Sequence, residues 1–335
     1  MARPMKPYRQ WTVAVFAALS VWLLVSLVHS PIAESAALQV GQGRIGPNGR
    51  LPSPDPPPLE TDLHLLTVSV VNKNYAVPGL SQDRFQVLED GVEQKISYFW
   101  QDSRPITVGF LMDASSSMTD AMNEAIRGAG QAFLKNKQPM DEFFVINFSD
   151  SPTMVVSYTM DSRMMPRLFP KIGESPLYDA IYLGLDAIKE AANPRKALLV
   201  ITAGNNNGKG VTEDQLVNYA IKQPVQIYSL LFGNSTSAAS ESSNVLDLLA
   251  GVSGGRASIA VDSSFNVEAL CAELAQALKT QYLIGYKSTN TAQNGKRRGV
   301  KVRVNSSDSA AKLSVWTQSG YYAPKESKNK SVTTK

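Results

Sequence analysis

A nearly continuous apolar run over residues 106–112 is the feature that most constrains how this chain can fold. A run of this length without polar alternation is typical of a strand buried on both faces of a parallel sheet. Shortly after it, apolar residues recur at helical spacing over residues 118–134. A buried strand followed by a helix predicts that an α/β sheet begins here.

The same alternation of strand and helix patterns continues to residue 279. Further strands are expected at 143–148, 154–158, 197–202, 225–232 and 257–261, and further helices at 180–191, 212–222, 245–250 and 266–279. This succession predicts a doubly wound, mostly parallel sheet of about six strands. The α/β domain is therefore expected over residues 104–279.

Two β-rich blocks flank the predicted α/β domain. The N-terminal block has strand patterns at 63–71, 84–88 and 93–100, the last two joined by the hairpin signal Asp90-Gly91. The C-terminal block has strand patterns at 281–286, 299–304 and 312–317, with a turn at Asn294-Gly295. Because about three strands are only marginally stable alone, we expect the two blocks, residues 59–103 and 280–325, to pair. The α/β domain would then be an insertion in a small β-sandwich.

The first strand of the predicted α/β domain, at 106–112, is followed directly by the sequence Asp113-Ala114-Ser115-Ser116-Ser117. Ligands of open α/β sheets bind outside the carboxyl ends of the strands, so a site is expected at this point. One carboxylate and two hydroxyls at alternate positions are ligands that suit a hard cation such as Mg²⁺. The alternative is that Ser115 and Ser117 only cap the next helix. These five residues alone do not separate the two interpretations.

Asp113, Ser115 and Ser117 form a D-x-S-x-S pattern that resembles the metal-ion-dependent adhesion site of von Willebrand factor type A (vWA) domains. Over roughly residues 60 to 324, the chain is similar to the bacterial VWFA-related family of exported vWA proteins. The matching residues are Phe85, Val87, Glu89, Asp90, Gly91, Gln94, Ile96 and Phe99, then Ser175-Pro176-Leu177-Tyr178-Asp179-Ala180, then Gln281, Tyr282, Gly285 and Tyr286, and finally Gly320-Tyr321-Tyr322-Ala323-Pro324. The resemblance implies a Rossmann-like vWA sheet.

The resemblance also implies a site for Mg²⁺ or Mn²⁺, with Asp113, Ser115, Ser117 and Ser175 as metal ligands. Ser175 stands at a threonine position of the family, and Ala203 stands where a T-D-G segment has its aspartate. The loss of one negative charge a few Å from the site weakens the binding of a cation by about 1–4 kcal/mol. This corresponds to about ten- to a thousandfold in affinity. The neighbouring acidic positions hold asparagine at 205–207.

Asp179 allows two interpretations. Its carboxylate either compensates for the missing aspartate, or it acts on the N-terminus of the next helix and on a nearby loop. The family's ligands supply a carboxylate to the ion, so an acidic residue of a protein partner is expected to complete the metal shell.

The N-terminal segment resembles an export signal or a membrane anchor. Arg3, Lys6 and Arg9 precede the uncharged apolar run at 11–28, which is nearly long enough to span a bilayer. Cleavage after Ser30 or Ser35 is sterically feasible, and an uncleaved anchor would also place the body outside the cytoplasm because the basic flank stays inside. A buried core helix is the third interpretation. The expected organisation is a signal or anchor at 1–30, a Pro/Gly linker at 31–58 and a disordered tail at 326–335.

Composition excludes several function classes. The net charge of +4 is too small to indicate nucleic acid binding. Cys271 is the only cysteine, so an intrachain disulfide is excluded, and its helical spacing with apolar neighbours predicts a core position. The two histidines, His29 and His64, offer little for zinc binding or Ser-His-Asp hydrolysis.

The sequence therefore predicts a non-catalytic, extracytoplasmic protein-interaction module, membrane-anchored, periplasmic or secreted. In one version of this module the metal ion takes part in binding the partner. In the other version the same face binds the partner without the ion. The second hypothesis is a metal-independent scaffold of the cell envelope, in which the β-sandwich makes the contacts. The third, an enzyme with Ser115 or Ser117 as nucleophile, lacks a natural base.

Overall fold

The computed structural model describes residues 63–72, 75–166, 173–232, 237–260, 266–305 and 313–325. The predicted signal or anchor, the linker and the tail lie outside these residues. Among the described helices, none is both long and apolar enough to cross a bilayer. The described residues all belong to one compact unit of the chain, residues 45–335.

The strands are β1 (His64–Asn72), β2 (Tyr75–Ala76), β3 (Phe85–Glu89), β4 (Val92–Gln94), β5 (Ile96–Asp102), β6 (Ile106–Asp113), β7 (Glu142–Phe148), β8 (Pro152–Thr159), β9 (Arg195–Thr202), β10 (Gln226–Phe232), β11 (Ala257–Ala260), β12 (Gln281–Tyr286), β13 (Arg297–Val304), β14 (Leu313–Trp316) and β15 (Gly320–Tyr322). The α-helices are α1 (Asp120–Asn136), α2 (Leu177–Ala187), α3 (Glu213–Ala220), α4 (Ser237–Ser253) and α5 (Val267–Lys279). Helix α4 begins earlier than expected, because its apolar spacing is clear only in its second half.

The central sheet has six strands in the order β11-β10-β9-β6-β7-β8. Its strands are parallel except β8, which runs antiparallel to β7 at the edge. This confirms the predicted doubly wound, mostly parallel sheet. The chain leaves β6 in one direction and later returns to its other side with β9, so the topological switch point lies between these two strands.

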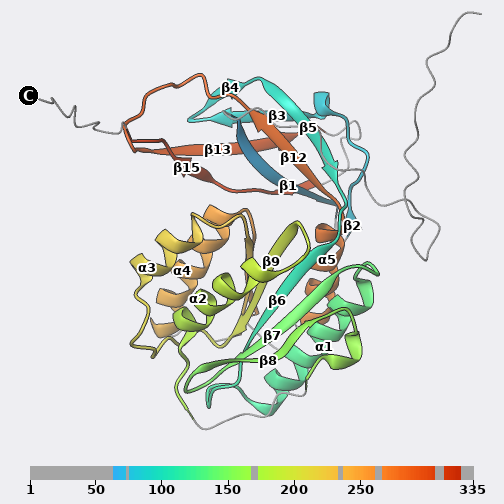
Figure 1. Ribbon diagram of the computed structural model, residues 1–335, viewed down its shortest axis with the longest axis vertical. Coiled ribbons are helices and arrows are strands. Elements are labelled where there is room, and N and C mark those ends of the chain that lie inside the picture. Colours follow the sequence, from blue (N-terminus) through green and yellow to red (C-terminus); the bar gives the residue numbers. More distant parts are fainter. Residues whose placement is uncertain are drawn as a thin grey trace, which may run out of the picture. The chain divides into compact units, whose positions relative to one another are not determined.

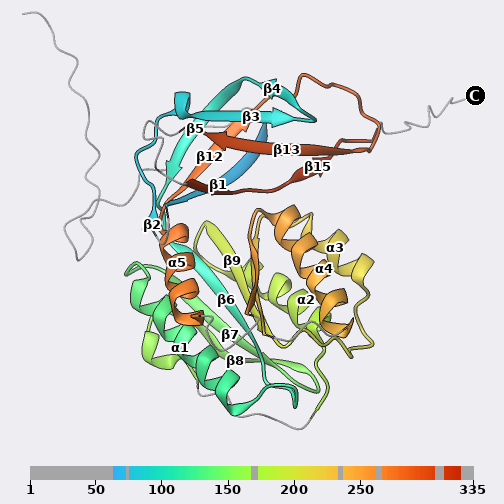
Figure 2. The same cartoon turned by 180° about the vertical axis from the view of Figure 1, so that it is seen from behind.

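Helices cover both faces of this sheet (Figures 1 and 2): α1 and α5 lie on one face, and α2, α3 and α4 lie on the other. Alternate residues of β6 therefore enter two separate cores, Phe110 with α1 and α5, and Leu111 with α2 and α3. All eight residues of β6 are buried, as the apolar run predicts. Cys271 is buried in the first of these cores, as expected.

The two flanking blocks pair with each other in two sheets. One has the order β14-β1-β12-β5, with β2 beside β1, and the other has the order β15-β13-β3-β4. Strands of the N-terminal block thus pair antiparallel with strands of the C-terminal block, as in β1 with β12 and β3 with β13. Their apolar faces form a third core that includes Leu66, Val87 and Tyr282. The structure confirms the expected pairing.

The prediction of one strand over 93–100 is wrong. The chain forms β4 up to Gln94 and a separate β5 from Ile96, with the exposed Lys95 between them. Strand β4 pairs with β3, whereas β5 pairs with β12 in the other sheet. The segment divides because one strand cannot pair in both sheets of a sandwich, and the chain changes sheets at a corner.

Candidate functional site

The predicted site residues lie at the carboxyl ends of β6 and β9, at the switch point of the sheet. Strand β6 ends at Asp113 and β9 ends at Thr202. Helix α2 begins at Leu177, so the loop before it brings Ser175 to the same edge. Three loops that are distant in sequence therefore meet where an open α/β sheet binds its ligands.

Asp113 is the centre of this edge and is fully buried. Its Oδ1 accepts the backbone N–H of Ser115 at 3.0 Å. Its Oδ2 accepts the Ser175 hydroxyl at 3.2 Å, the Thr202 hydroxyl at 2.7 Å and the Ala203 N–H at 3.2 Å. The structure thus brings Asp113, Ser115 and Ser175 together, and these bonds compensate a carboxylate that water does not reach.

The two predicted serines of the first loop differ in their surroundings. Ser115 is buried, and its hydroxyl oxygen has no hydrogen-bond partner among the described residues. Ser117 is exposed, and its hydroxyl oxygen accepts the Asn205 amide at 2.6 Å. Neither serine caps helix α1. The N-cap is Thr119, whose side chain accepts the Met122 N–H at 3.2 Å. The helix-cap interpretation of this motif is therefore wrong.

Sequence reasoning missed two side chains of this site. The Thr202 hydroxyl donates to Asp113 and also accepts the Gly204 N–H at 2.9 Å, so it fixes the turn after β9. Asn205 joins the loop after β9 to Ser117. The threonine of the T-D-G position was the available signal for the first residue. In the sequence the asparagines at 205–207 indicate only lost charge, and no pattern indicates which hydroxyl an amide reaches.

Asp179 contacts the loop after β9. Its Oδ1 accepts the Val211 N–H at 3.1 Å, and its Oδ2 is buried without a partner among the described residues. A Cβ at Gly208 or Gly210 would lie 2.4 or 2.1 Å from its carboxylate oxygens, so both glycines let this loop approach closely. These contacts agree with the expected role in the nearby loop and do not place the carboxylate against Asp113.

The residues of the site fit a hard cation in chemistry and fall short in charge. Its donors are oxygens only, and the unpaired buried hydroxyl of Ser115 is a free ligand atom of the required type. At Ala203 a backbone N–H faces Asp113 where a second carboxylate would add charge. No group of three or more His, Cys, Asp or Glu side chains in the described ranges is arranged to hold a metal ion. The described residues thus offer a cation the carboxylate of Asp113 and otherwise neutral oxygens.

No protein-family model matches the sequence, and no curated protein matches it. Solved structures do match. BatB from Bacteroides thetaiotaomicron is 17% identical over 52% of this chain and 99% of its own, with a TM-score of 0.43. A von Willebrand factor type A protein from Catenulispora acidiphila is 10% identical over 81% of this chain and 76% of its own, with a TM-score of 0.45.

The vWF domain of the type V pili tip protein Mfa5 from Porphyromonas gingivalis is 12% identical over 52% of this chain and 95% of its own, with a TM-score of 0.43. The chain is thus similar to solved vWA domains, in agreement with the resemblance of its motifs.

Proposed function

We propose that this protein is a non-catalytic, extracytoplasmic interaction module that binds a protein partner at the carboxyl ends of β6 and β9. The observation that carries the proposal is the Asp113 cluster at the switch point of the sheet. A fully buried carboxylate there holds three loops together, while the buried Ser115 hydroxyl beside it lacks a partner. A buried polar atom without a partner costs about 1–3 kcal/mol, which a bound ligand can recover.

The finer part of the proposal is a weak site for Mg²⁺ or Mn²⁺. Asp113, Ser115, Ser117 and Ser175 would hold the ion, which would supply positive charge for an acidic side chain of the partner. The single carboxylate makes the ion dependent on that additional acid. The support for this part is the oxygen-only donor set and the unpaired Ser115 hydroxyl.

Asp113 lies far from the histidine of the described residues. His64 lies in the sandwich, where its ring stacks on that of Tyr321 with 4.0 Å between their centroids. Strand β6 begins shortly after β5 of the sandwich and runs for eight residues to Asp113. The eight residues of β6 span about 25 Å at the rise per residue of a strand. Ser115 and Ser117 therefore have no imidazole base from the described residues, which supports a non-catalytic role.

Titration calorimetry of the full-length chain with Mg²⁺ and Mn²⁺ tests the ion-dependent version. We expect weak binding that Ser115→Ala weakens further. Ala203→Asp adds the second carboxylate and should tighten binding by about ten- to a thousandfold. Ala192→Asp adds the same charge at an exposed position just before β9, at the other end of that strand, and should leave the affinity unchanged.

Absence of heat up to millimolar metal, for both the natural chain and Ala203→Asp, would exclude the ion-dependent version. Once a partner is known, a capture experiment with the Asp113→Ala variant distinguishes the interaction module from the envelope scaffold. Unchanged capture by this variant would favour contacts made by the β-sandwich.

The location of the protein is the remaining part of the proposal. The basic flank and the apolar run at 11–28 support export with the body outside the cytoplasm. Protease added to spheroplasts, in which periplasmic proteins are accessible, should cleave the body, and extraction of membranes at alkaline pH should release it only if the segment is removed. Protection of the body from protease would contradict this location.

A further inference from the structure

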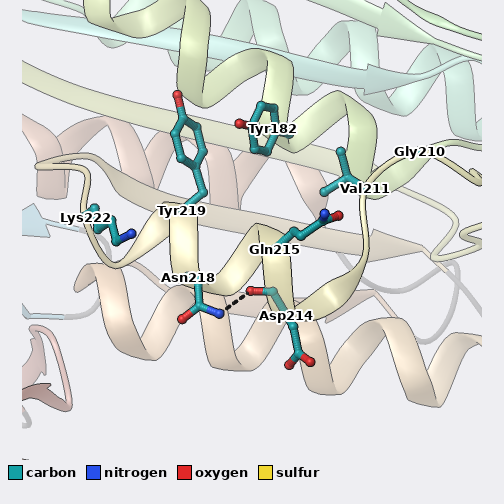
Figure 3. Close-up of a pocket in the computed structure, with 8 residues that line it drawn as sticks. All are labelled: Tyr182, Gly210, Val211, Asp214, Gln215, Asn218, Tyr219 and Lys222. Carbon is teal, nitrogen blue, oxygen red and sulfur yellow. Dashed lines mark hydrogen bonds between the residues drawn. The ribbon is translucent and has the colours of Figure 1, made fainter. Parts of the chain in front are cut away.

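A second surface of the α/β domain has the shape and charge of a binding groove. Two cavities of about 550 and 620 Å³ share Tyr182, Gly210 and Val211 in their lining, so they adjoin along helices α2 and α3. Figure 3 shows the first of them, with Tyr182 of α2 beside Tyr219 of α3 and Val211 on the loop that leads into α3. Volumes of this order are typical of ligand-binding clefts.

The charge of the second cavity is mainly negative. Its lining carries the carboxylates of Asp150, Glu174, Asp179 and Asp186 against the single ammonium of Lys209. Only Asp186 has a cation partner among the described residues, Lys189 at 2.9 Å. The buried Oδ2 of Asp179 lies below the glycine loop and adds its negative charge to the floor of the groove.

An aromatic side chain of the groove already contacts a cation, that of Lys189, which itself lines neither cavity. The rings of Tyr182 and Tyr219 stack with their centroids 4.3 Å apart. The Lys189 ammonium lies 4.7 Å from the centroid of the Tyr219 ring and donates to the hydroxyl of the same residue. An ammonium over a tyrosine face is stabilised by the negative face of the ring. Tyr182 lines both cavities, and it therefore offers an aromatic surface between the acidic cavity and the neighbouring one.

We propose that this groove between α2 and α3 binds a cationic segment of a protein partner, an extended stretch with Lys or Arg beside apolar side chains. The basic groups would face Asp150 and Glu174, with the charge of Asp179 below the glycine loop adding to the attraction, and the apolar groups would pack on Tyr182 and Val211. The proposal rests on the proposed interaction function, but it needs no metal, and it places the partner's positive charge beside the Asp113 edge. Complementary charge of this kind sets specificity and association rate.

Fluorescence anisotropy with two dye-labelled peptides tests the groove on the full-length chain in EDTA. The probes are acetyl-Gly-Lys-Leu-Lys-Gly-amide and the same peptide with glutamate in place of lysine. We expect the lysine peptide to bind and the glutamate peptide not to bind. Glu174→Lys should weaken binding about tenfold or more, and Asp179→Asn about threefold. Tyr182→Leu keeps an apolar side chain, removes the ring and should also weaken binding.

Asp247→Lys is the matched control, because Asp247 is exposed on α4 and lines neither cavity. The affinity of Asp247→Lys for the lysine peptide should stay within twofold of the affinity of the natural chain. Equal binding of both peptides, or an equal loss in Asp247→Lys, would overturn the proposal. Absence of lysine-peptide binding in EDTA, together with binding of the glutamate peptide once Mg²⁺ replaces EDTA, would assign peptide binding to the Asp113 site and would also overturn the proposal. Self-association in sedimentation that Glu174→Lys abolishes would show that a second copy of the chain occupies the groove, and would also overturn it.

Discussion

Asp113 accepts four hydrogen bonds, and three of their donors come from residues 62, 89 and 90 positions further along the chain. The fourth comes from the N–H of Ser115 within the same loop. A carboxylate with no exposed surface depends on such donors, because each lost bond leaves charge without compensation. The local order of this edge is therefore decided by residues that are far apart in sequence.

Thr202 provides the shortest of these bonds, so its hydroxyl should contribute measurably to stability. Thr202→Val keeps the shape and removes the donor to Asp113, and we expect it to lower the free energy of unfolding by about 2 kcal/mol. Thr202→Ser keeps the hydroxyl and should lose clearly less. Urea unfolding followed by circular dichroism gives both values. Equal stability of the two variants would show that the bond to Asp113 contributes little.

At the scale of elements, apolar spacing predicted helix α5 and the position of Cys271 on it. The helix begins after Asn266, whose side chain accepts the Ala269 N–H at 2.8 Å. Its buried residues Val267, Cys271, Leu274 and Leu278 form one face that packs on the sheet. This face is continuous because residues three and four apart in a helix lie on the same side.

Cys271 should be unreactive in the folded protein. Burial raises the pKa of its thiol to about 12, and only the thiolate reacts with disulfide reagents. We expect Ellman's reagent at pH 8 to modify almost no thiol in the native chain and one thiol per chain in urea. Rapid modification under native conditions would contradict the buried position of this helix face.

Strands β4 and β5 show where spacing alone misleads at this scale. Residues 93–100 are expected to form one strand, yet the two halves pair in different sheets. Alternation predicts that a segment is extended, but its hydrogen-bond partner depends on which strand lies beside it. The break at Lys95 follows from the closure of the sandwich, which involves the C-terminal block.

On the scale of the whole molecule, Glu89 joins the two β blocks that the α/β domain separates. It lies at the end of β3 and is 2% exposed. Its carboxylate accepts the hydroxyls of Tyr286 and Tyr321, each at 2.9 Å, and that of Ser288 at 2.6 Å. The Arg298 guanidinium lies 3.1 Å from it and is also buried. All four partners come from the C-terminal block, so this network holds the sandwich closed.

Glu89→Gln should destabilise the protein most at neutral pH. Burial acts to raise the pKa of the Glu89 carboxyl, but the hydrogen bonds from Ser288, Tyr286, Arg298 and Tyr321 outweigh burial and hold the pKa below its usual value. Because the folded pKa lies below the unfolded one, the stabilisation is complete above about pH 4.3 and is lost as the pH falls through the folded pKa. We expect a loss of about 3 kcal/mol at pH 7, since Arg298 is left without its counter-charge.

Urea unfolding at pH 7 and at pH 3 measures the difference in stability between the natural chain and Glu89→Gln. This difference should be smaller at pH 3. Glu93→Gln is the control, because Glu93 is exposed on the neighbouring strand β4 and should change stability by less than about 0.5 kcal/mol. A difference between the natural chain and Glu89→Gln that is independent of pH would show that the ionised carboxylate is not what stabilises the sandwich.

The sequence by itself determined the α/β sheet, the buried strand β6, the core position of Cys271 and the residue at the centre of the site, Asp113. These follow from local periodicity and from a motif confined to five residues. Only the tertiary structure decided that Thr202 and Asn205 complete the site, that Asp179 binds the loop after β9, and that β4 and β5 separate. Each of those outcomes depends on which segments lie side by side in the fold, and the spacing of residues within one segment does not contain that information.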